Sequence, residues 1–221
     1  KIHETHSGLT NLVITNRCDL TCWYCFFYAG AAGYIYEPTL EELRAMVQQI
    51  ADEKPIAGNA IQITGGNPEL REDLCDIIRM IKEVGIDHIQ VNTNATHKLY
   101  KDPEFAKSIR EAGANTVYLS FDGVTPRTNP KNHWEVPGIL NSCRQADLGI
   151  VLVPTMINTV NDHEAGDILR FGFQHNDIVR GVNYQPVSLV GRMPASERKR
   201  FRITIPDVIQ RLEEQTNGMV H

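Results

Sequence analysis

Residues 9–25, LTNLVITNRCDLTCWYC, run from an apolar, strand-like segment directly into three closely spaced cysteines. Cys18, Cys22 and Cys25 follow the segment Leu9–Thr15 at spacings of four and three residues. Thiolates are soft ligands suited to iron–sulfur clusters and to zinc. One short loop with these spacings can turn three sulfur atoms toward a common point. The sequence therefore predicts a metal centre where the first strand ends.

Three cysteine ligands leave one iron of a four-iron cluster without a protein ligand and open to a small molecule. The same reasoning separates closed structural zinc sites from open catalytic ones. A zinc site completed by a distant His or Cys is the alternative that the spacing alone leaves open. Cys75 and Cys143 fall inside amphipathic helical patterns, where a free cysteine packs as a small apolar residue. An odd cysteine count with one tight cluster also argues against a disulfide framework.

Strand-like segments alternate with helical segments along the rest of the chain. A capping box of Thr39 and Glu42 opens one helix, and Gly85 closes another. This alternation implies right-handed crossovers and a parallel sheet. Six such units predict an α/β fold of the open, partial (β/α)6 barrel type, whereas Gly30 and Gly33 do not complete the fingerprint of a dinucleotide-binding sheet. The predicted strands are 9–15, 60–64, 88–93, 116–121, 150–156 and 181–186, and the predicted helices are 39–53, 70–83, 102–112, 135–148 and 162–174.

Two of these helices have an apolar face that the sequence predicts to be buried. The first face comprises Leu40, Leu43, Val47 and Ile50, and the second comprises Leu74, Ile77, Ile78 and Ile81.

Charge and hydropathy exclude several classes of protein. The 221 residues include 22 basic and 27 acidic side chains, a net charge of −5, which is unlike the basic footprint of a nucleic-acid binder. The longest apolar runs, such as 149–154, are far short of the ~20 residues that span a bilayer. The polar start, without Met, and the abrupt end at His221 predict a single domain, residues 1–221, excerpted from a longer chain. An oxygen-sensitive cluster would imply a reducing, cytoplasmic compartment.

The C-x-x-x-C-x-aromatic-C loop after the first strand resembles the radical S-adenosylmethionine (SAM) superfamily, and the resemblance covers about residues 9–190. It implies a partial (β/α)6, TIM-like barrel that holds a [4Fe–4S] cluster on Cys18, Cys22 and Cys25. The amino and carboxylate groups of SAM would bind the fourth iron. Reduction of the cluster would then cleave SAM to methionine and a 5′-deoxyadenosyl radical that abstracts hydrogen from a substrate. With this resemblance, zinc becomes a remote alternative.

The segment Gly65-Gly66-Asn67-Pro68 resembles the G-G-E-P motif of this superfamily after the second strand. The resemblance implies that its backbone acceptors bind the SAM ammonium group, and glycine permits close approach. Asn67 replaces the usual Glu, so only the backbone role carries over. A Gly-Pro turn that ends a strand is the alternative interpretation.

Two further segments resemble parts of the SAM pocket. Tyr24, just before the third cysteine, matches a residue beside the adenine. Thr93 and Asn94, after Asn92, resemble a T-N-G or T-N-A motif that lines the pocket, although ordinary turn chemistry is equally compatible.

Ser120-Phe121-Asp122-Gly123 resembles an S-x-D-G motif. Ser120 would reach the SAM carboxylate or ribose, and Asp122 would contact a ribose hydroxyl or support the loop. A cation usually follows to pair with the SAM carboxylate. Lys131 is favoured slightly over Arg127, although such charges are most often solvated.

The ends of the fifth and sixth strands supply the last candidates. Thr155 and Asn158 would reach the ribose, and Asn183 and Gln185 would contact substrate or adenine.

Three longer phrases, at residues 22–43, 120–137 and 182–193, resemble an archaeal branch that includes tetraether lipid synthases and proteins called pterin dimethyltransferases. This implies C–C coupling of isoprenoid lipid chains in lipid biosynthesis. Pterin methylation or peptide modification is the alternative, and a metal-binding or electron-transfer module without SAM chemistry is the alternative of another class. The implied partners are a small-molecule or lipid substrate and a low-potential electron donor such as ferredoxin or flavodoxin. A lipid substrate would add peripheral membrane contact without a transmembrane segment.

Overall fold

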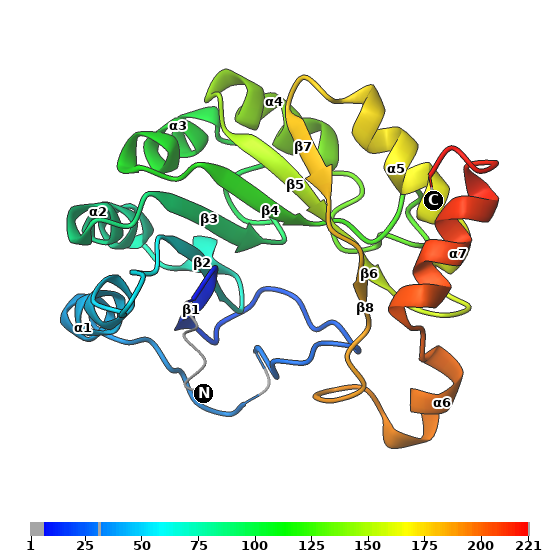
Figure 1. Ribbon diagram of the computed structural model, residues 1–221, viewed down its shortest axis with the longest axis horizontal. Helices are drawn as coiled ribbons and strands as arrows, with labels where there is room; N and C mark the ends of the chain where they lie inside the picture. Colours follow the sequence, from blue (N-terminus) through cyan, green and yellow to red (C-terminus); the bar gives the residue numbers. More distant parts are fainter. Residues whose placement is uncertain (1–6, 31, 221) are drawn as a thin grey trace.

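The computed structural model describes residues 7–30 and 32–220 and has an α/β fold built on one parallel sheet (Figure 1). Six strands lie in the order β1-β2-β3-β4-β5-β7, and each neighbouring pair is parallel. The expected open, partial barrel is confirmed. The strands are β1 (Thr10–Thr15), β2 (Ala60–Gly65), β3 (His88–Thr93), β4 (Thr116–Ser120), β5 (Gly149–Val153) and β7 (Val179–Val182).

Two predicted strands are each divided in the structure. The segment 150–156 becomes β5 and β6 (Thr155–Met156), separated by Pro154, which has no N–H to donate to a ladder. The segment 181–186 becomes β7 and β8 (Gln185–Pro186), and β6 pairs with β8 as a separate two-stranded parallel sheet. This small sheet lies just beyond the ends of β5 and β7 in the chain.

Helices cover the outer face of the sheet (Figure 1). The crossover helices are α1 (Leu40–Ala51), α2 (Leu74–Val84), α3 (Pro103–Ala112), α4 (Val136–Gln145) and α5 (Ala165–Gln174). Short 3-10 turns occupy Pro68–Leu70 and Asp162–Glu164, so α2 and α5 begin later than the sequence predicted. Helices α6 (Arg198–Phe201) and α7 (Ile205–Gln215), and the 3-10 turn Ala195–Glu197, were not predicted.

Local signals in the sequence explain where the helices begin and end. The Thr39 hydroxyl accepts from the Glu42 backbone N–H, and the Glu42 carboxylate accepts from the Thr39 N–H, as the capping box predicted. Gly85 ends α2 in the left-handed conformation, with φ 103°. Leu40 is the exception to the predicted apolar face of α1, because it is 39% exposed in the first turn while the three other residues of that face are buried.

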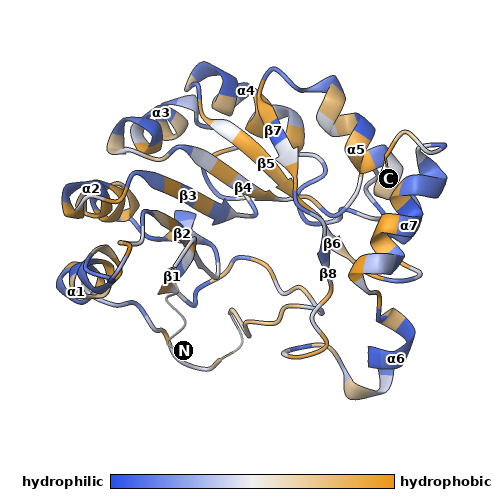
Figure 2. Cartoon of the chain, viewed as in Figure 1, coloured by the Kyte–Doolittle hydropathy of each residue, from blue (hydrophilic) through white to orange (hydrophobic). Residues whose placement is uncertain are grey.

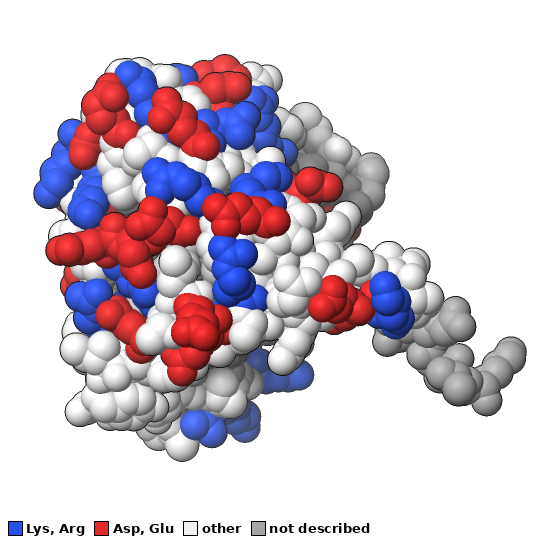
Figure 3. Space-filling view, turned by 90° about the vertical axis from the view of Figure 1, so that its left-hand side faces the viewer, with Lys and Arg blue, Asp and Glu red and all other residues white. Residues whose placement is uncertain are grey.

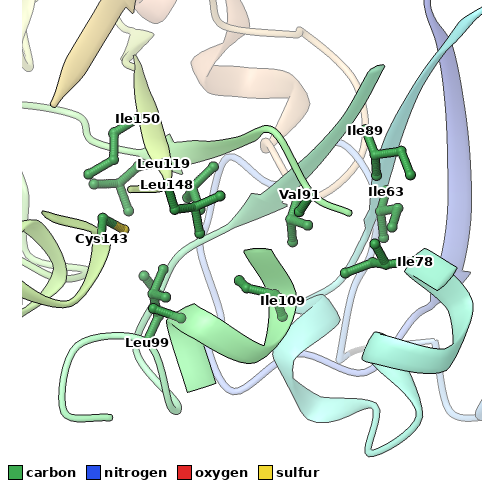
Figure 4. Close-up of a cluster of buried hydrophobic side chains, with 14 of the residues drawn as sticks. Ile63, Ile78, Ile89, Val91, Leu99, Ile109, Leu119, Cys143, Leu148 and Ile150 are labelled. Atoms are coloured by element: carbon green, nitrogen blue, oxygen red, sulfur yellow. The ribbon is translucent and has the colours of Figure 1, made fainter. Parts of the chain in front are cut away.

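The core lies between the sheet and its helices. Apolar residues cover the strands and the inward faces of the helices, whereas the outward faces are polar (Figure 2). Side chains from β2 to β5 meet those of α2 to α4 there, including Ile63, Ile78, Val91 and Leu119 (Figure 4). Burying one such side chain contributes about 1.5–3 kcal/mol. Cys143 belongs to this cluster and is fully buried, as its helical position predicted.

The outer surface of the helices carries interspersed charges of both signs (Figure 3). Several form ion pairs, such as Arg44 with Glu83 and Lys107 with Glu104. Exposed pairs of this kind stabilise a fold by at most about 1 kcal/mol each. Within residues 7–30 and 32–220, every helix is too short or too polar to span a bilayer.

Candidate active site

A cavity of about 180 Å³, open to solvent, lies where the strands of the main sheet end. The long loop between β1 and α1 runs beneath these strand ends toward β8 (Figure 1). Loops at this edge of a parallel sheet commonly carry catalytic groups. The cavity is lined by Cys18, Leu20, Cys22, Tyr24, Cys25, Phe26, Phe27, Ala29, Thr64, Gly65, Gly66, Asn92, Thr93, Asn94, Ser120, Lys131, Thr155, Gln185, Pro186 and Ser188.

The three cysteines of the loop after β1 all line this cavity. The Cys25 N–H donates to the Cys22 carbonyl at 3.2 Å, which closes a turn between the two residues. The Cys25 carbonyl accepts from the Arg192 N–H at 2.9 Å, so the chain after β8 is bonded to the loop at its third cysteine. Within the described residues, no three His, Cys, Asp or Glu side chains already stand at metal-binding spacing.

Burial controls the ionisation of two of these thiols. It raises the pKa of Cys18 to about 11, and it also raises the pKa of Cys22, although the Lys131 ammonium opposes that rise. A metal centre must therefore displace protons when it binds. Three soft donors on one cavity wall fit a cluster that takes three protein ligands and leaves one iron facing the cavity.

Two glycines at the end of β2 allow this strand to pack against the end of β1. A Cβ atom on Gly65, where φ is 136°, would lie 2.0 Å from the Thr15 carbonyl oxygen. A Cβ on Gly66 would lie 1.8 Å from the Arg17 carbonyl oxygen. Both glycines line the cavity. Their lack of a side chain is required by the neighbouring backbone, a reason that the sequence did not reveal.

The next two residues of this motif lie behind the cavity wall. Asn67 is fully buried, and its Nδ2 lies 3.0 Å from the Asp19 Oδ1 and 3.0 Å from the Asn94 Oδ1. Pro68 is buried and opens a 3-10 turn. Asn67 thus connects the end of β2 to the cysteine loop.

At the end of β3, Thr93 and Asn94 line the cavity and are also bonded behind it. The Thr93 hydroxyl donates to Glu69 Oε1 at 2.6 Å. The other Glu69 oxygen accepts from the backbone N–H groups of residues 98 and 99 at 2.7 and 3.1 Å. Glu69 was missed by the sequence reasoning, because nothing in its local pattern distinguishes it from an exposed acidic residue.

A buried ion pair stands behind Ser120 and Tyr24. Lys131 Nζ lies 2.8 Å from Asp122 Oδ2 and 3.0 Å from Ser120 Oγ. The Tyr24 hydroxyl donates to the same Asp122 oxygen, and burial beside this carboxylate raises the pKa of Tyr24 well above its usual value. Asp122 lies behind the cavity wall, whereas Lys131 reaches it. Arg127, the other candidate cation, is exposed away from this wall.

Of the four remaining candidates, two line the cavity and two do not. Thr155 and Gln185 line the cavity, and the Thr155 N–H donates to Asp122 Oδ1 at 2.9 Å. Asn158 lies outside the wall and donates to the Arg200 carbonyl at 2.9 Å. Asn183 is exposed and also lies outside the wall. The geometry does not bring these last two residues to the cavity.

Two asparagines that the sequence reasoning missed join the loops at the strand ends. Asn132 Nδ2 donates to the carbonyls of Asn94 and Ser120, at 2.6 and 2.8 Å. Asn161 Nδ2 donates to the carbonyls of Asp122 and Thr155, at 2.7 and 2.8 Å. Each is an isolated residue in a loop, so no spacing or periodicity indicates its role.

Comparison with known proteins identifies the family of this chain. Residues 12–172 match the family model described as the radical SAM superfamily. The chain is 38% identical over 224 residues to 7,8-dihydro-6-hydroxymethylpterin dimethyltransferase of Methanocaldococcus jannaschii, which covers 99% of this chain and 44% of that protein. It is 30% identical over 197 residues to GTP 3′,8-cyclase of Limosilactobacillus fermentum, covering 85% of this chain and 58% of that protein.

The chain therefore spans about half the length of the curated relatives it matches. Among solved structures, Streptococcus suis SuiB bound to the precursor peptide SuiA has the same fold, with a TM-score of 0.69, 15% sequence identity, and coverage of 96% of this chain and 46% of that one. The family match covers most of the sheet and the cysteine loop that lines the cavity. The chain belongs to the radical SAM superfamily, whose enzymes use a [4Fe–4S] cluster and S-adenosylmethionine.

Proposed function

We propose that this chain is the core of a radical SAM enzyme that acts on a pterin-type heterocycle, with methylation as the reaction. The observation that carries this proposal is the 38% identity, over 99% of the chain, with a protein named a pterin dimethyltransferase. A second group of relatives is named for GTP. Guanine and pterin share a fused ring with an amino and an oxo group on its pyrimidine part. A common heterocycle class is therefore the simplest account of both names.

The cysteine loop supplies the groups that would hold the cluster. Cys18, Cys22 and Cys25 are its proposed ligands, since all three line one cavity. When bound, the reduced cluster and SAM supply a 5′-deoxyadenosyl radical that abstracts hydrogen. The Arg192 N–H donates to the Cys25 carbonyl, so the chain after β8 anchors the backbone of the turn from Cys22 to Cys25.

The same cavity, close to Tyr24, supplies groups suited to the charged end of SAM. Lys131 would pair with the SAM carboxylate, with Ser120 beside it. Asp122 holds this ammonium in place, because the side chains of Lys131 and Asp122 are only 8% and 4% exposed and lie 2.8 Å apart. The backbone at Gly65 and Gly66 would accept from the SAM ammonium. Charge-assisted hydrogen bonds of this kind contribute about 1.5–3 kcal/mol each.

The rest of the wall combines amide and aromatic side chains. Asn92 and Gln185 offer donors and acceptors that match the amino and oxo groups of a pterin ring. Phe26 and Phe27 offer aromatic faces on which a flat heterocycle stacks. Leu20 lines the same cavity and would help to exclude water from a radical reaction.

Transfer of deuterium tests the choice of substrate. Protein reconstituted with iron and sulfide under anaerobic conditions, reduced with dithionite and given SAM would be incubated with 6-hydroxymethyl-7,8-dihydropterin deuterated at its carbon positions. We expect more 5′-deoxyadenosine than without substrate, and we expect it to carry deuterium from the pterin, as mass spectrometry would show. With a second SAM as the methyl donor, the methylated pterin would form together with S-adenosylhomocysteine, and dithionite would supply the electron that this transfer needs. No stimulation and no deuterium in 5′-deoxyadenosine, from protein that cleaves SAM, would contradict the pterin assignment.

A second candidate is C–C coupling of isoprenoid lipid chains, because apolar side chains are exposed along the cysteine loop. Phe26, Tyr34 and Ile35 are 63%, 69% and 68% exposed. An apolar chain that approaches the cavity would cover them, and the protein would then make peripheral contact with a membrane. A parallel incubation with an isoprenoid lipid deuterated at its terminal methyl groups tests this candidate. Deuterium in 5′-deoxyadenosine from the lipid, and none from the pterin, would favour it.

The electron for either reaction must come from outside this chain. A ferredoxin or flavodoxin is the proposed donor, and dithionite replaces it in these assays.

A further inference from the structure

The chain has an amide at position 67, where the family motif has a carboxylate, and it has a carboxylate at position 19 in the cysteine loop. Asn67 is fully buried, and each of its polar atoms faces a partner. Its Nδ2 donates to Asp19 Oδ1 and to Asn94 Oδ1, both at 3.0 Å. Its Oδ1 accepts from the Glu69 backbone N–H at 3.4 Å and lies 2.8 Å from the Thr93 hydroxyl oxygen. Only an uncharged amide provides two donors and an acceptor in this arrangement.

Asp19 is fixed by side chains from two different strand ends. Its Oδ1 accepts from Asn67 at 3.0 Å and from Asn94 at 3.1 Å, and its Oδ2 accepts from the Thr96 hydroxyl at 2.7 Å. These donors follow β2 and β3, so one carboxylate ties the cysteine loop to both strands. The outer edge of Asp19 is exposed to solvent.

The same contacts reach the first cysteine. Asp19 directly follows Cys18, and Asn94 Nδ2, which donates to Asp19, also lies 3.9 Å from Cys18 Sγ. The Leu20 N–H lies 3.5 Å from this sulfur as well. The position of Cys18 therefore depends on groups that Asp19 itself holds.

We propose that Asp19 is a positioning residue of the cluster site, which fixes Cys18 and places a permanent negative charge beside the cluster, with Asn67 as its required neutral partner. The proposal rests on the proposed role of the three cysteines as cluster ligands. Net charge and hydrogen bonds at the sulfur atoms are among the factors that set the reduction potential of such a cluster. A carboxylate beside Cys18 favours the oxidised, more positive cluster and so lowers this potential.

The test exchanges the carboxylate and the amide between positions 19 and 67. Asn67→Asp is isosteric, but it brings a second carboxylate within 3.0 Å of Asp19 Oδ1 and of Asn94 Oδ1, which are both acceptors. Like charges this close, one of them buried, repel strongly. Asp19→Asn in the same chain removes the repulsion between the two carboxylates and restores a donor and acceptor pair between positions 19 and 67, with the Asn94 amide turned over to match both. Asp19→Asn alone removes the charge while its oxygen still accepts from Asn67 and Asn94.

Each variant would be reconstituted anaerobically and measured for iron per chain, for the rate at which a chelator removes the iron, and for midpoint potential. We expect several-fold less iron and faster loss for Asn67→Asp, and recovery of both in Asp19→Asn/Asn67→Asp. We expect a less negative midpoint potential for Asp19→Asn. Two matched controls, at the other end of the sheet, should behave as wild type: Asn115→Asp, and Asp87→Asn, whose side chain is 90% exposed.

Two results would overturn the inference. One is an Asn67→Asp protein that loads and keeps iron as wild type does, or a double variant that fails to recover. The other is an Asp19→Asn protein with the same midpoint potential as Asp87→Asn, a measurement that remains decisive if the Asn67 variants do not fold. Wild-type protein that takes up no cluster would instead contradict the proposed function, so the two failures are distinguishable.

Discussion

The helix-covered face of the sheet and the edge at which its strands end belong to the same six strands but are held by different forces. On the covered face, residues such as Ile63 and Ile78 are fully buried among apolar side chains. At the edge, buried side chains such as Asn132 and Asn161 bond to carbonyls of neighbouring loops. Apolar burial is non-directional and stabilises the barrel, whereas these bonds are directional and fix where each loop lies.

The largest expected effect comes from replacing a cysteine at the edge of the sheet, compared with replacing a cysteine in the core. Cys22→Ala should abolish cluster binding and SAM cleavage, because a ligand is lost, while the free energy of unfolding of the apoprotein changes by less than about 0.5 kcal/mol. Cys143→Ala in the core is the matched control, which should keep the cluster and lose about 1 kcal/mol of stability. Iron analysis, 5′-deoxyadenosine assays and denaturant unfolding measure these effects. SAM cleavage by Cys22→Ala protein would remove this residue from the ligand set.

A large cavity in the core should act on stability alone. Ile78 is fully buried in α2, so Ile78→Ala should lower the free energy of unfolding by about 2–5 kcal/mol. SAM affinity should be unchanged at temperatures where the protein is folded. Ile56→Ala, at a residue that is 55% exposed, should cost less than about 0.5 kcal/mol. Equal losses from the two variants, measured by urea unfolding, would contradict this description of the core.

Substitutions at the edge where the strands end should change the affinity for SAM. Lys131→Met should weaken SAM binding by about 10- to 150-fold, which corresponds to the loss of one charge-assisted hydrogen bond of about 1.5–3 kcal/mol. It also leaves the buried Asp122 carboxylate without its cation, so stability falls too. Lys131→Met/Asp122→Asn should recover that stability without recovering SAM affinity.

Arg127→Met is the control for the charge, and its SAM affinity should equal that of wild type. Calorimetric titration with SAM distinguishes the variants. A greater loss of SAM affinity in the Arg127 variant than in the Lys131 variant would show that Arg127, and not Lys131, contacts the SAM carboxylate.

The smallest expected effect concerns a residue that lies beside the site but outside its wall. Asn158 bonds to the Arg200 carbonyl, so Asn158→Ala should change SAM affinity by less than about twofold and stability by about 0.5 kcal/mol or less. Titration with SAM and thermal unfolding measure both quantities. A tenfold loss of SAM affinity would mean that Asn158 reaches the ligand in the bound protein.

The core was predictable from the sequence because its signals are local. The capping box at Thr39 and the apolar spacing of α2 lie within a few residues of one another, and the structure has both. The cysteine loop was predictable because its three cysteines lie within eight residues. Asp19 was not, because its partner Asn94 lies 75 residues away and neither residue is unusual in its own segment. Polar contacts that depend on the folded topology leave no local pattern.

Formation of 5′-deoxyadenosine tests the central claim most directly. Anaerobically reconstituted protein, reduced with dithionite and supplied with SAM, should release 5′-deoxyadenosine and methionine in equal amounts. Neither product should form without reductant or with the Cys22→Ala variant. Protein that carries a reduced [4Fe–4S] cluster and binds SAM but releases no 5′-deoxyadenosine, with or without the pterin and the lipid, would contradict the account.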